Sequence, residues 1–181
     1  MTKDELLTLI DQAAAEGWTD LDLSGNELTE LPEAIGHLTQ LERLTLGKGK
    51  KHEDGSQQWG YTIINGQQCL IPSVIGNAIK KLPDCLADLK NLHYLDISGN
   101  PVGEIPDWID QLINLKTLVA LTSEIKYISP KLAQLSSLQE LHLSGNQITE
   151  IPDFLAQLSS LQELHLSGNQ ITEIPDFLAQ L

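Results

Sequence analysis

The sequence predicts an α/β solenoid, with a curved parallel β-sheet on the concave face and short helical turns on the convex face. Residues 135–157 read LSSLQELHLSGNQITEIPDFLAQ, and residues 158–180 repeat those 23 letters without a change. The spacing of apolar residues, Asn and Pro in this unit also recurs through the earlier part of the chain. A period of this length is typical of stacked repeats, each too small to bury its apolar edge alone.

Each repeat unit predicts one short strand, a turn and a return path. In a unit numbered from 1 to 23, positions 7 and 9 are apolar and positions 6 and 8 are polar, so the strand buries one face. Asparagine at position 12 favours a turn, and proline at position 18 favours a short helical turn. The turn asparagines are expected to stack as an internal column: Asn26, Asn77, Asn100, Asn146 and Asn169.

This frame divides residues 15–181 into six repeats. Five of them are uninterrupted units, and the remaining unit begins at Leu38. That unit is split, because 31 residues separate Leu46 from Asn77 where the frame expects 3. We therefore expect an insertion of 28 residues, lying within residues 47–76.

The two ends of the array are predicted to differ. Residues 2–14 are expected to form an N-terminal capping helix, in which Thr2 and Glu5 fit a capping box. No such cap follows the last repeat, so we expect a piece of a longer protein whose uncapped end forms a homodimer. The apolar residues expected at that end are Leu161, Leu164, Leu166, Ile171, Ile174 and Leu178.

The insertion is predicted to form a β-hairpin. Two β-prone runs flank Asn65-Gly66, a dipeptide typical of tight hairpin turns. Two interpretations of this hairpin stay open. Either Trp59 and Tyr61 grip a partner, or the hairpin packs against the edge of the solenoid.

Composition narrows the classes of partner. The net charge of −14 disfavours nucleic acid and membrane surfaces and favours a protein partner with a basic surface. Cys69 and Cys85 are expected to be free thiols, and neither a signal peptide nor an apolar run long enough to span a bilayer is evident. These features favour a cytoplasmic location.

No catalytic arrangement is evident, so we expect neither an enzyme nor a cofactor. The segment Gly47-Lys48-Gly49-Lys50 lacks the glycine spacing and the Ser or Thr of a phosphate-binding loop. The regular repeat positions offer no Ser/His/Asp or Cys/His set.

The concave face is the expected binding surface, because its outward side chains are free to meet a partner. The residues expected to bind the partner, on this face and on the hairpin, are Asp22, Arg43, Trp59, Tyr61, Tyr94, Asp96, Val119, Leu121, Glu140, His142, Glu163 and His165. Within this set the fourth repeat departs from the pattern. Val119 and Leu121 are apolar where neighbouring repeats carry polar residues, and Ser123 replaces the turn asparagine. Together with Tyr94, Val119 and Leu121 predict an apolar island within an acidic rim, as at the centre of a protein interface. The alternative is that these substitutions are sequence drift without a binding role.

The tandem copy also places His142 beside His165 on adjacent predicted strands, with Glu140 and Glu163 close by. Two histidines and carboxylates are ligands that zinc accepts. The duplication alone accounts for this arrangement, however, so we expect a solvated pair and no metal site.

The unit in Leu138–Leu155 resembles that of intracellular leucine-rich repeats. More narrowly, the chain resembles the N-terminal repeat region of bacterial, particularly cyanobacterial, Roco proteins. The motifs that carry the resemblance are LTLGK at Leu44–Lys48 before an insertion, LDISGNP at Leu95–Pro101, and the tandem NQITEIP. In that family the repeats precede a Ras-like GTPase domain and a dimerising module.

Three functions are compatible with the sequence. The first is a scaffold that binds a protein partner through the concave face and the hairpin. The second, implied by the resemblance, is a regulatory or dimerising module of an attached Roc GTPase. The third and least favoured is a secreted bacterial effector.

Overall fold

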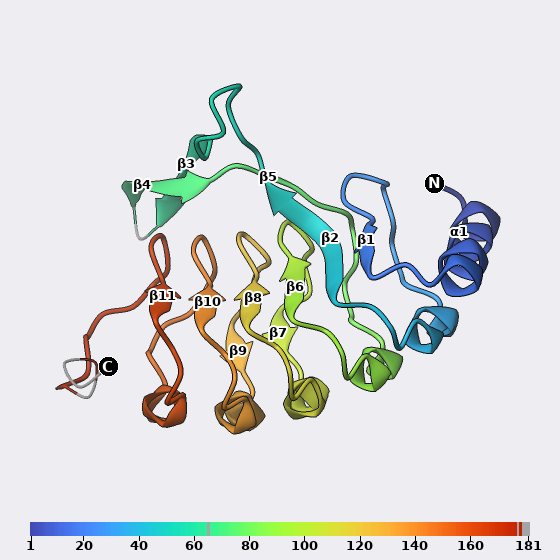
Figure 1. The fold of residues 1–181 in the computed structure, drawn as a ribbon. Coiled ribbons are helices and arrows are strands. Elements are labelled where there is room, and N and C mark those ends of the chain that lie inside the picture. The colour runs from blue at the N-terminus through green and yellow to red at the C-terminus, as the bar shows by residue number, and fades with distance from the viewer. Residues whose placement is uncertain (65, 177, 179–181) are drawn as a thin grey trace.

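The computed structural model describes residues 1–64, 66–176 and 178, and shows a curved array that begins with a helix (Figure 1). Helix α1, Lys3–Glu16, begins at a capping box in which the Thr2 hydroxyl accepts from the Glu5 amide and the Glu5 carboxylate accepts from the Thr2 amide. It ends at Gly17, whose left-handed backbone turns the chain toward the first strand. Leu6, Ile10 and Ala13 are buried on the core side of the helix, where they cover the first repeat.

Six short parallel strands form the concave sheet in the order β1-β2-β6-β8-β10-β11. Their bounds are β1 Asp20–Asp22, β2 Arg43–Gly49, β6 Tyr94–Ile97, β8 Thr117–Val119, β10 Glu140–His142 and β11 Glu163–His165. Equivalent repeat positions pair across the sheet, as Leu44 does with Leu95. One strand per repeat in a shared parallel sheet confirms the predicted solenoid.

The return paths carry short 3-10 helices on the convex face. These are η1 Glu33–His37, η2 Asp84–Asp88, η3 Asp107–Gln111, η4 Pro130–Gln134 and η5 Asp153–Gln157. Four of them follow the position-18 proline directly, and in η4 the shifted Pro130 opens the helix. Strands β7, Glu104–Ile105, and β9, Tyr127–Ile128, pair in parallel on the return side.

The turn asparagines are held by backbone hydrogen bonds between neighbouring coils. Asn146 is 3% exposed, and its side chain bonds four backbone groups. Its carbonyl accepts from the amides of Ser123 and Ile125, and its Nδ2 donates to the carbonyls of Ala120 and Leu143. Such a side chain satisfies donors and acceptors that the turn would otherwise bury unpaired.

The fourth repeat lacks both the usual glycine and the usual asparagine of this turn. Ser123 replaces the asparagine, and its hydroxyl donates to the carbonyls of Ile97 and Leu121. Thr122 replaces the glycine and adopts a φ of 49°, where Gly145 in the next repeat has a φ of 76°. A β-branched residue is strained in this left-handed region.

The insertion leaves the sheet through the long β2 and returns along its edge. Strand β3, Trp59–Ile64, pairs antiparallel with β4, Gln67–Pro72, and β5, Val74–Ile75, pairs antiparallel with β2. The predicted hairpin is therefore present, although Asn65 lies outside the described residues. Figure 1 shows this segment passing over the turns that follow the strands of the later repeats.

Close contacts with glycines hold the hairpin against those turns. A Cβ placed on Gly168 would lie 2.8 Å from Cγ2 of Ile71, and one placed on Gly145 would lie 3.6 Å from Cβ of Ile71. Val74 approaches Gly99 in the same way, at 2.8 Å. The inner face of the hairpin therefore packs on the edge of the solenoid, which is one of the two arrangements left open by the sequence.

Candidate functional site: a groove between the concave sheet and the insertion

A groove of about 750 Å³ lies between the insertion and the concave ends of β6, β8 and β10. It brings together several residues that the sequence predicted for partner binding: Tyr94, Asp96, Val119, Leu121, Glu140 and His142. The opposing wall comes from the insertion and comprises Lys48, Gly49, Lys50, Lys51, Gln57, Gln58 and Ile75. Nothing in the sequence placed these lysines opposite the sheet.

A chain of polar contacts crosses the sheet at one end of the groove. The Arg43 guanidinium lies 3.9 Å from the ring centroid of Tyr94, and its Nε lies 3.3 Å from a carboxylate oxygen of Asp20. The Tyr94 hydroxyl donates a 3.1 Å hydrogen bond to Asp96 Oδ2. Arg43 and Tyr94 are thus fixed against each other by cation–π attraction and by their acidic neighbours.

Asp96 differs from the expectation of an accessible binding residue, because it is only 2% exposed. Its Oδ1 accepts from the Ser98 amide at 2.9 Å, and Tyr94 covers Oδ2. Burial raises the pKa of this carboxyl to about 6, an effect that its hydrogen bonds only partly offset. Asp96 can therefore orient Tyr94, but it does not itself offer an open carboxylate to a partner.

The predicted apolar island forms the floor of the groove and does not protrude from it. Val119 is 9% exposed and Leu121 is half-buried, so both present only part of their side chains. Leu121 directly precedes the strained Thr122, whose Oγ1 is buried and has no hydrogen-bond partner in the described part of the chain. Backbone strain of this kind costs stability and is found most often at binding and catalytic sites.

The basic wall is partly tied to the sheet. Lys48 Nζ lies 2.6 Å from Asp22 Oδ2, which links the start of the insertion to β1. Lys50 and Lys51 are exposed at the rim. The groove therefore has cationic side chains on one rim and Glu140 on the other, above an apolar floor.

The remaining predicted residues lie outside this groove. Trp59 and Tyr61 are 49% and 68% exposed on β3, on a strand face they share with Ile63. The register of β4 puts Leu70 opposite Tyr61, on the same face. The hairpin thus carries an exposed apolar surface in addition to the face that holds it to the repeats.

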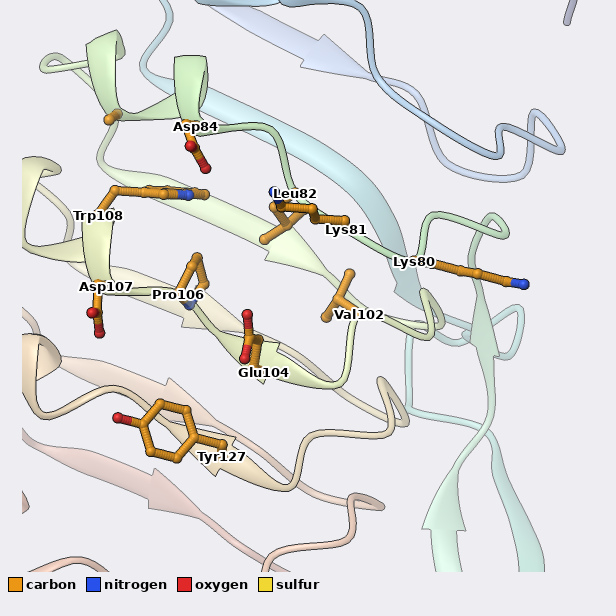
Figure 2. A pocket seen from close by; sticks show the side chains of 11 residues that line it. Lys80, Lys81, Leu82, Asp84, Val102, Glu104, Pro106, Asp107, Trp108 and Tyr127 are labelled. Atoms are coloured by element: carbon orange, nitrogen blue, oxygen red, sulfur yellow. The ribbon is translucent and has the colours of Figure 1, made fainter.

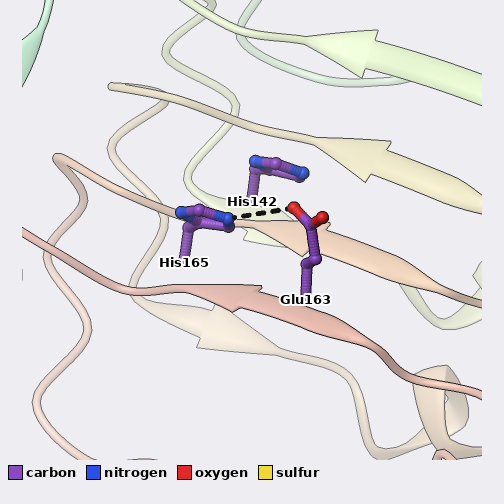
Figure 3. Close-up of side chains that lie close together, drawn as sticks. All are labelled: His142, Glu163 and His165. Atoms are coloured by element: carbon purple, nitrogen blue, oxygen red, sulfur yellow. Dashed lines mark hydrogen bonds and ion pairs between the residues drawn. The ribbon is translucent and has the colours of Figure 1, made fainter.

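Glu163 and His165 continue the concave face on β11. The rings of His142 and His165 stack with centroids 4.4 Å apart and planes 6° apart (Figure 3). His165 Nε2 lies 3.3 Å from Glu163 Oε2, and His142 Nε2 lies 3.5 Å from Glu140 Oε2. The structure thus brings together the pair that the duplication predicted.

A second hollow, of about 650 Å³, lies on the return side beside β7 and was not predicted. Figure 2 shows Trp108 and Tyr127 on two sides of it, with Glu104 and Pro106 between them. Tyr127 stands where the tandem units carry Glu150 and Glu173, and this aromatic departure was the only signal in the sequence. The lining mixes lysines with carboxylates and has no set of convergent polar groups, so we take the concave groove as the candidate site.

Comparisons with known proteins agree with this architecture. A family model described as Leucine Rich repeats (2 copies) matches residues 136–180, and one described as Leucine Rich Repeat matches residues 18–38 and 91–112. Among curated proteins, none matches the sequence significantly.

Several solved structures are similar. A leucine-rich-repeat protein of Leptospira interrogans is 26% identical with a TM-score of 0.63, over 93% of this chain and 42% of that one. A plant ice-binding protein is 24% identical with a TM-score of 0.56, over 83% of this chain and 42% of that one. An internalin of Listeria monocytogenes is 23% identical with a TM-score of 0.53, over 80% of this chain and 33% of that one. This chain thus spans less than half of each relative.

The last two similarities concern the fold alone. The first, together with the family models, agrees with the architecture described above: one strand per repeat in a shared parallel sheet, with an asparagine turn in every repeat but the fourth. No helix in the described part of the chain has the length and apolarity needed to cross a bilayer. The chain therefore has a leucine-rich-repeat fold.

Proposed function

We propose that this protein binds a protein partner in the groove between its concave sheet and its insertion. Leucine-rich-repeat domains generally mediate protein–protein interaction, and in this chain we assign that role to the groove. The observation that supports it is the convergence of Tyr94, Val119 and Leu121 with the lysine rim of the insertion on one hollow. Aromatic and aliphatic anchors within a polar rim are the usual composition of an interface centre.

The partner favoured by these contacts is a segment with one apolar anchor and basic flanking residues. The apolar floor accepts the anchor, while Glu140 attracts a cationic group on the sheet side, across from the lysine rim. The net charge of −14 adds long-range attraction for a basic partner, and this attraction weakens as salt is added.

A capture experiment with matched variants tests this proposal. Leu121→Arg places a charged side chain on the groove floor, whereas Gln157→Arg makes the same kind of change on the exposed convex end of η5. We expect the wild-type protein and the convex variant to retain the same partner, and the groove variant to lose it. Equal capture by the groove variant would contradict the proposal.

A second candidate role is regulation or dimerisation of an attached Roc GTPase. It is favoured by the LTLGK motif at Leu44–Lys48 and the insertion that follows, which resemble Roco repeat regions. The measurement that tests it is GTP hydrolysis by a longer chain carrying such a domain, with and without residues 1–181. An unchanged rate and an unchanged oligomeric state would remove this role. A role as a secreted effector has less support, because the similarity to an internalin extends to the fold alone.

We also propose a reducing, cytoplasmic environment for the protein. Cys69 on β4 and Cys85 on η2 are both free thiols. Burial and the neighbouring Glu33 carboxylate raise the pKa of Cys85 to about 11, so it is an unreactive thiol at neutral pH. Cell fractionation is the direct test, and recovery from an oxidising compartment would contradict the proposal.

A further inference from the structure

The neighbouring strands β10 and β11 carry a compact group of potential metal ligands on the concave face. The parallel register pairs His142 with His165 and Glu140 with Glu163. The groups are brought close by the strand spacing, because equivalent residues of adjacent parallel strands lie about 4.8 Å apart. Figure 3 shows both imidazoles and the Glu163 carboxylate facing one another from the two strands.

The distances are close to those of a coordination site. One ligand atom from each of His142, Glu163 and His165 lies within 4.8 Å of the other two. In a tetrahedral zinc site with bonds of about 2.0–2.1 Å, ligand atoms are about 3.3 Å apart. Closing the site therefore requires side-chain movements of roughly 1–2 Å, and the stacked rings must tilt so that both nitrogen lone pairs point at one ion. Because Glu163 and His165 are exposed, their side chains have room to make that movement.

The surroundings of His142 Nε2 give a second observation that supports a metal site, independent of the distances between the ligand atoms. Its Nε2 is buried and has no hydrogen-bond partner among the described residues, since the Glu140 oxygen at 3.5 Å lies outside hydrogen-bonding geometry. A buried ring nitrogen without a partner is unusual in a folded protein. A metal ion at this position would supply the partner that this nitrogen lacks.

We propose that His142, His165 and Glu163 bind a divalent transition-metal ion, with zinc as the best match. In this site each histidine supplies Nε2, and Glu163 moves from its contact with His165 Nε2 to the ion. The three protein ligands leave one tetrahedral position for water. Two imidazole nitrogens select zinc and its transition-metal neighbours over magnesium and calcium, which prefer oxygen ligands.

The site is tested with the metal alone, so the result does not depend on the partner proposal. Zinc is titrated calorimetrically into the purified chain at about neutral pH, and we expect one ion per chain. In the double variant His142→Asn/His165→Asn, affinity should fall by more than about tenfold. The control is His37→Asn, because His37 is exposed on the far side of the array at the end of η1. It should bind as the wild type does.

Two further measurements separate a true site from weak surface binding. Cobalt should give the visible absorption of a four-coordinate ion with the wild type and with His37→Asn, but not with the double variant. Zinc should also raise the unfolding temperature of the wild type and of the control, but not that of the double variant. Undiminished zinc binding by the double variant, or displacement of zinc by an equal concentration of magnesium, would overturn the proposal. So would a wild-type chain that binds no zinc.

Discussion

Ile71 in the inserted hairpin occupies the space that a side chain on Gly168 of the last repeat would need. A Cβ on that glycine would lie only 2.8 Å from Ile71 Cγ2. The insertion therefore begins in the second repeat and reaches the sixth, where it rests on the strand-end turns. The insertion thus connects the second repeat with the sixth, whereas stacking brings each repeat into contact only with its immediate neighbours.

This contact predicts that Ile71→Ala loosens the hairpin without unfolding the repeats. Loss of the half-buried side chain should lower the free energy of local opening by about 1–2 kcal/mol. Amide hydrogen exchange in β3 and β4 should then be roughly tenfold faster, with exchange in β8 and β10 unchanged. Ile63→Ala, on the exposed face of the same hairpin, is the matched control. Equal effects of the two substitutions would show that the contact does not hold the hairpin.

The asparagine column predicts a large cost for Asn146→Ala. The substitution leaves the amides of Ser123 and Ile125 and the carbonyl of Ala120 without their partner, whereas the Leu143 carbonyl keeps its bond from Asn169 Nδ2. It should lower the free energy of unfolding by about 3 kcal/mol. Asn114→Ala is the control, because Asn114 is more exposed and donates one bond, to the Lys90 carbonyl. Its cost should be less than about 1 kcal/mol. Urea unfolding measures both, and similar costs would refute a special role for the column.

Thr122→Gly is predicted to stabilise the protein. The substitution removes left-handed strain and an unpaired buried hydroxyl, and the greater freedom of glycine in the unfolded chain offsets part of that gain. We expect the free energy of unfolding to rise by about 1 kcal/mol. Thermal unfolding measures the change. A loss of stability would mean that Thr122 makes contacts that outweigh its strain.

Asp96 predicts a pH-dependent contribution to stability. Its folded pKa of about 6 exceeds the ordinary Asp value of 3.8, so the folded state binds the proton more tightly than the unfolded state. The stability it contributes is present below about pH 4 and is lost as pH rises through about 6. The pKa difference corresponds to roughly 3 kcal/mol as an upper bound.

Asp96→Asn should remove this dependence, because the amide cannot ionise. The variant should gain stability relative to the wild type as pH rises from about 4 to 6, and the difference should be constant above that range. Urea unfolding of both proteins across the range measures it. A difference that does not change with pH would show that Asp96 ionises normally in the folded protein.

The far end of the array predicts self-association. Within the described residues β11 pairs with β10 on one side only, and Ile174 is 79% exposed. An open strand edge beside apolar surface favours a twofold, end-to-end dimer. Sedimentation should show a concentration-dependent dimer that Ile174→Lys weakens. A wild-type monomer at high concentration would contradict this prediction.

The groove shows where sequence reasoning reached its limit. The outward positions of the repeat identified Tyr94, Val119 and Leu121 correctly as neighbours, because a fixed period places them on adjacent strands. The same rule treated Asp96 as an open carboxylate. It could not foresee that the Tyr94 hydroxyl would bind Asp96 Oδ2, or that Asp96 would be only 2% exposed, because the alternation of the strand predicts an outward side chain and not what covers it.

The sequence by itself determined the repeat, its strand, its turn and the stacking of one coil on the next. These follow from a local period that every unit repeats, so neighbouring units must bury the same apolar face. The path of the insertion was decided only in the tertiary structure. A hairpin's own residues set its pairing, but Ile71 finds its place on Gly145 and Gly168 only after four further coils have brought those turns to the same edge. The groove and its lysine rim result from that packing.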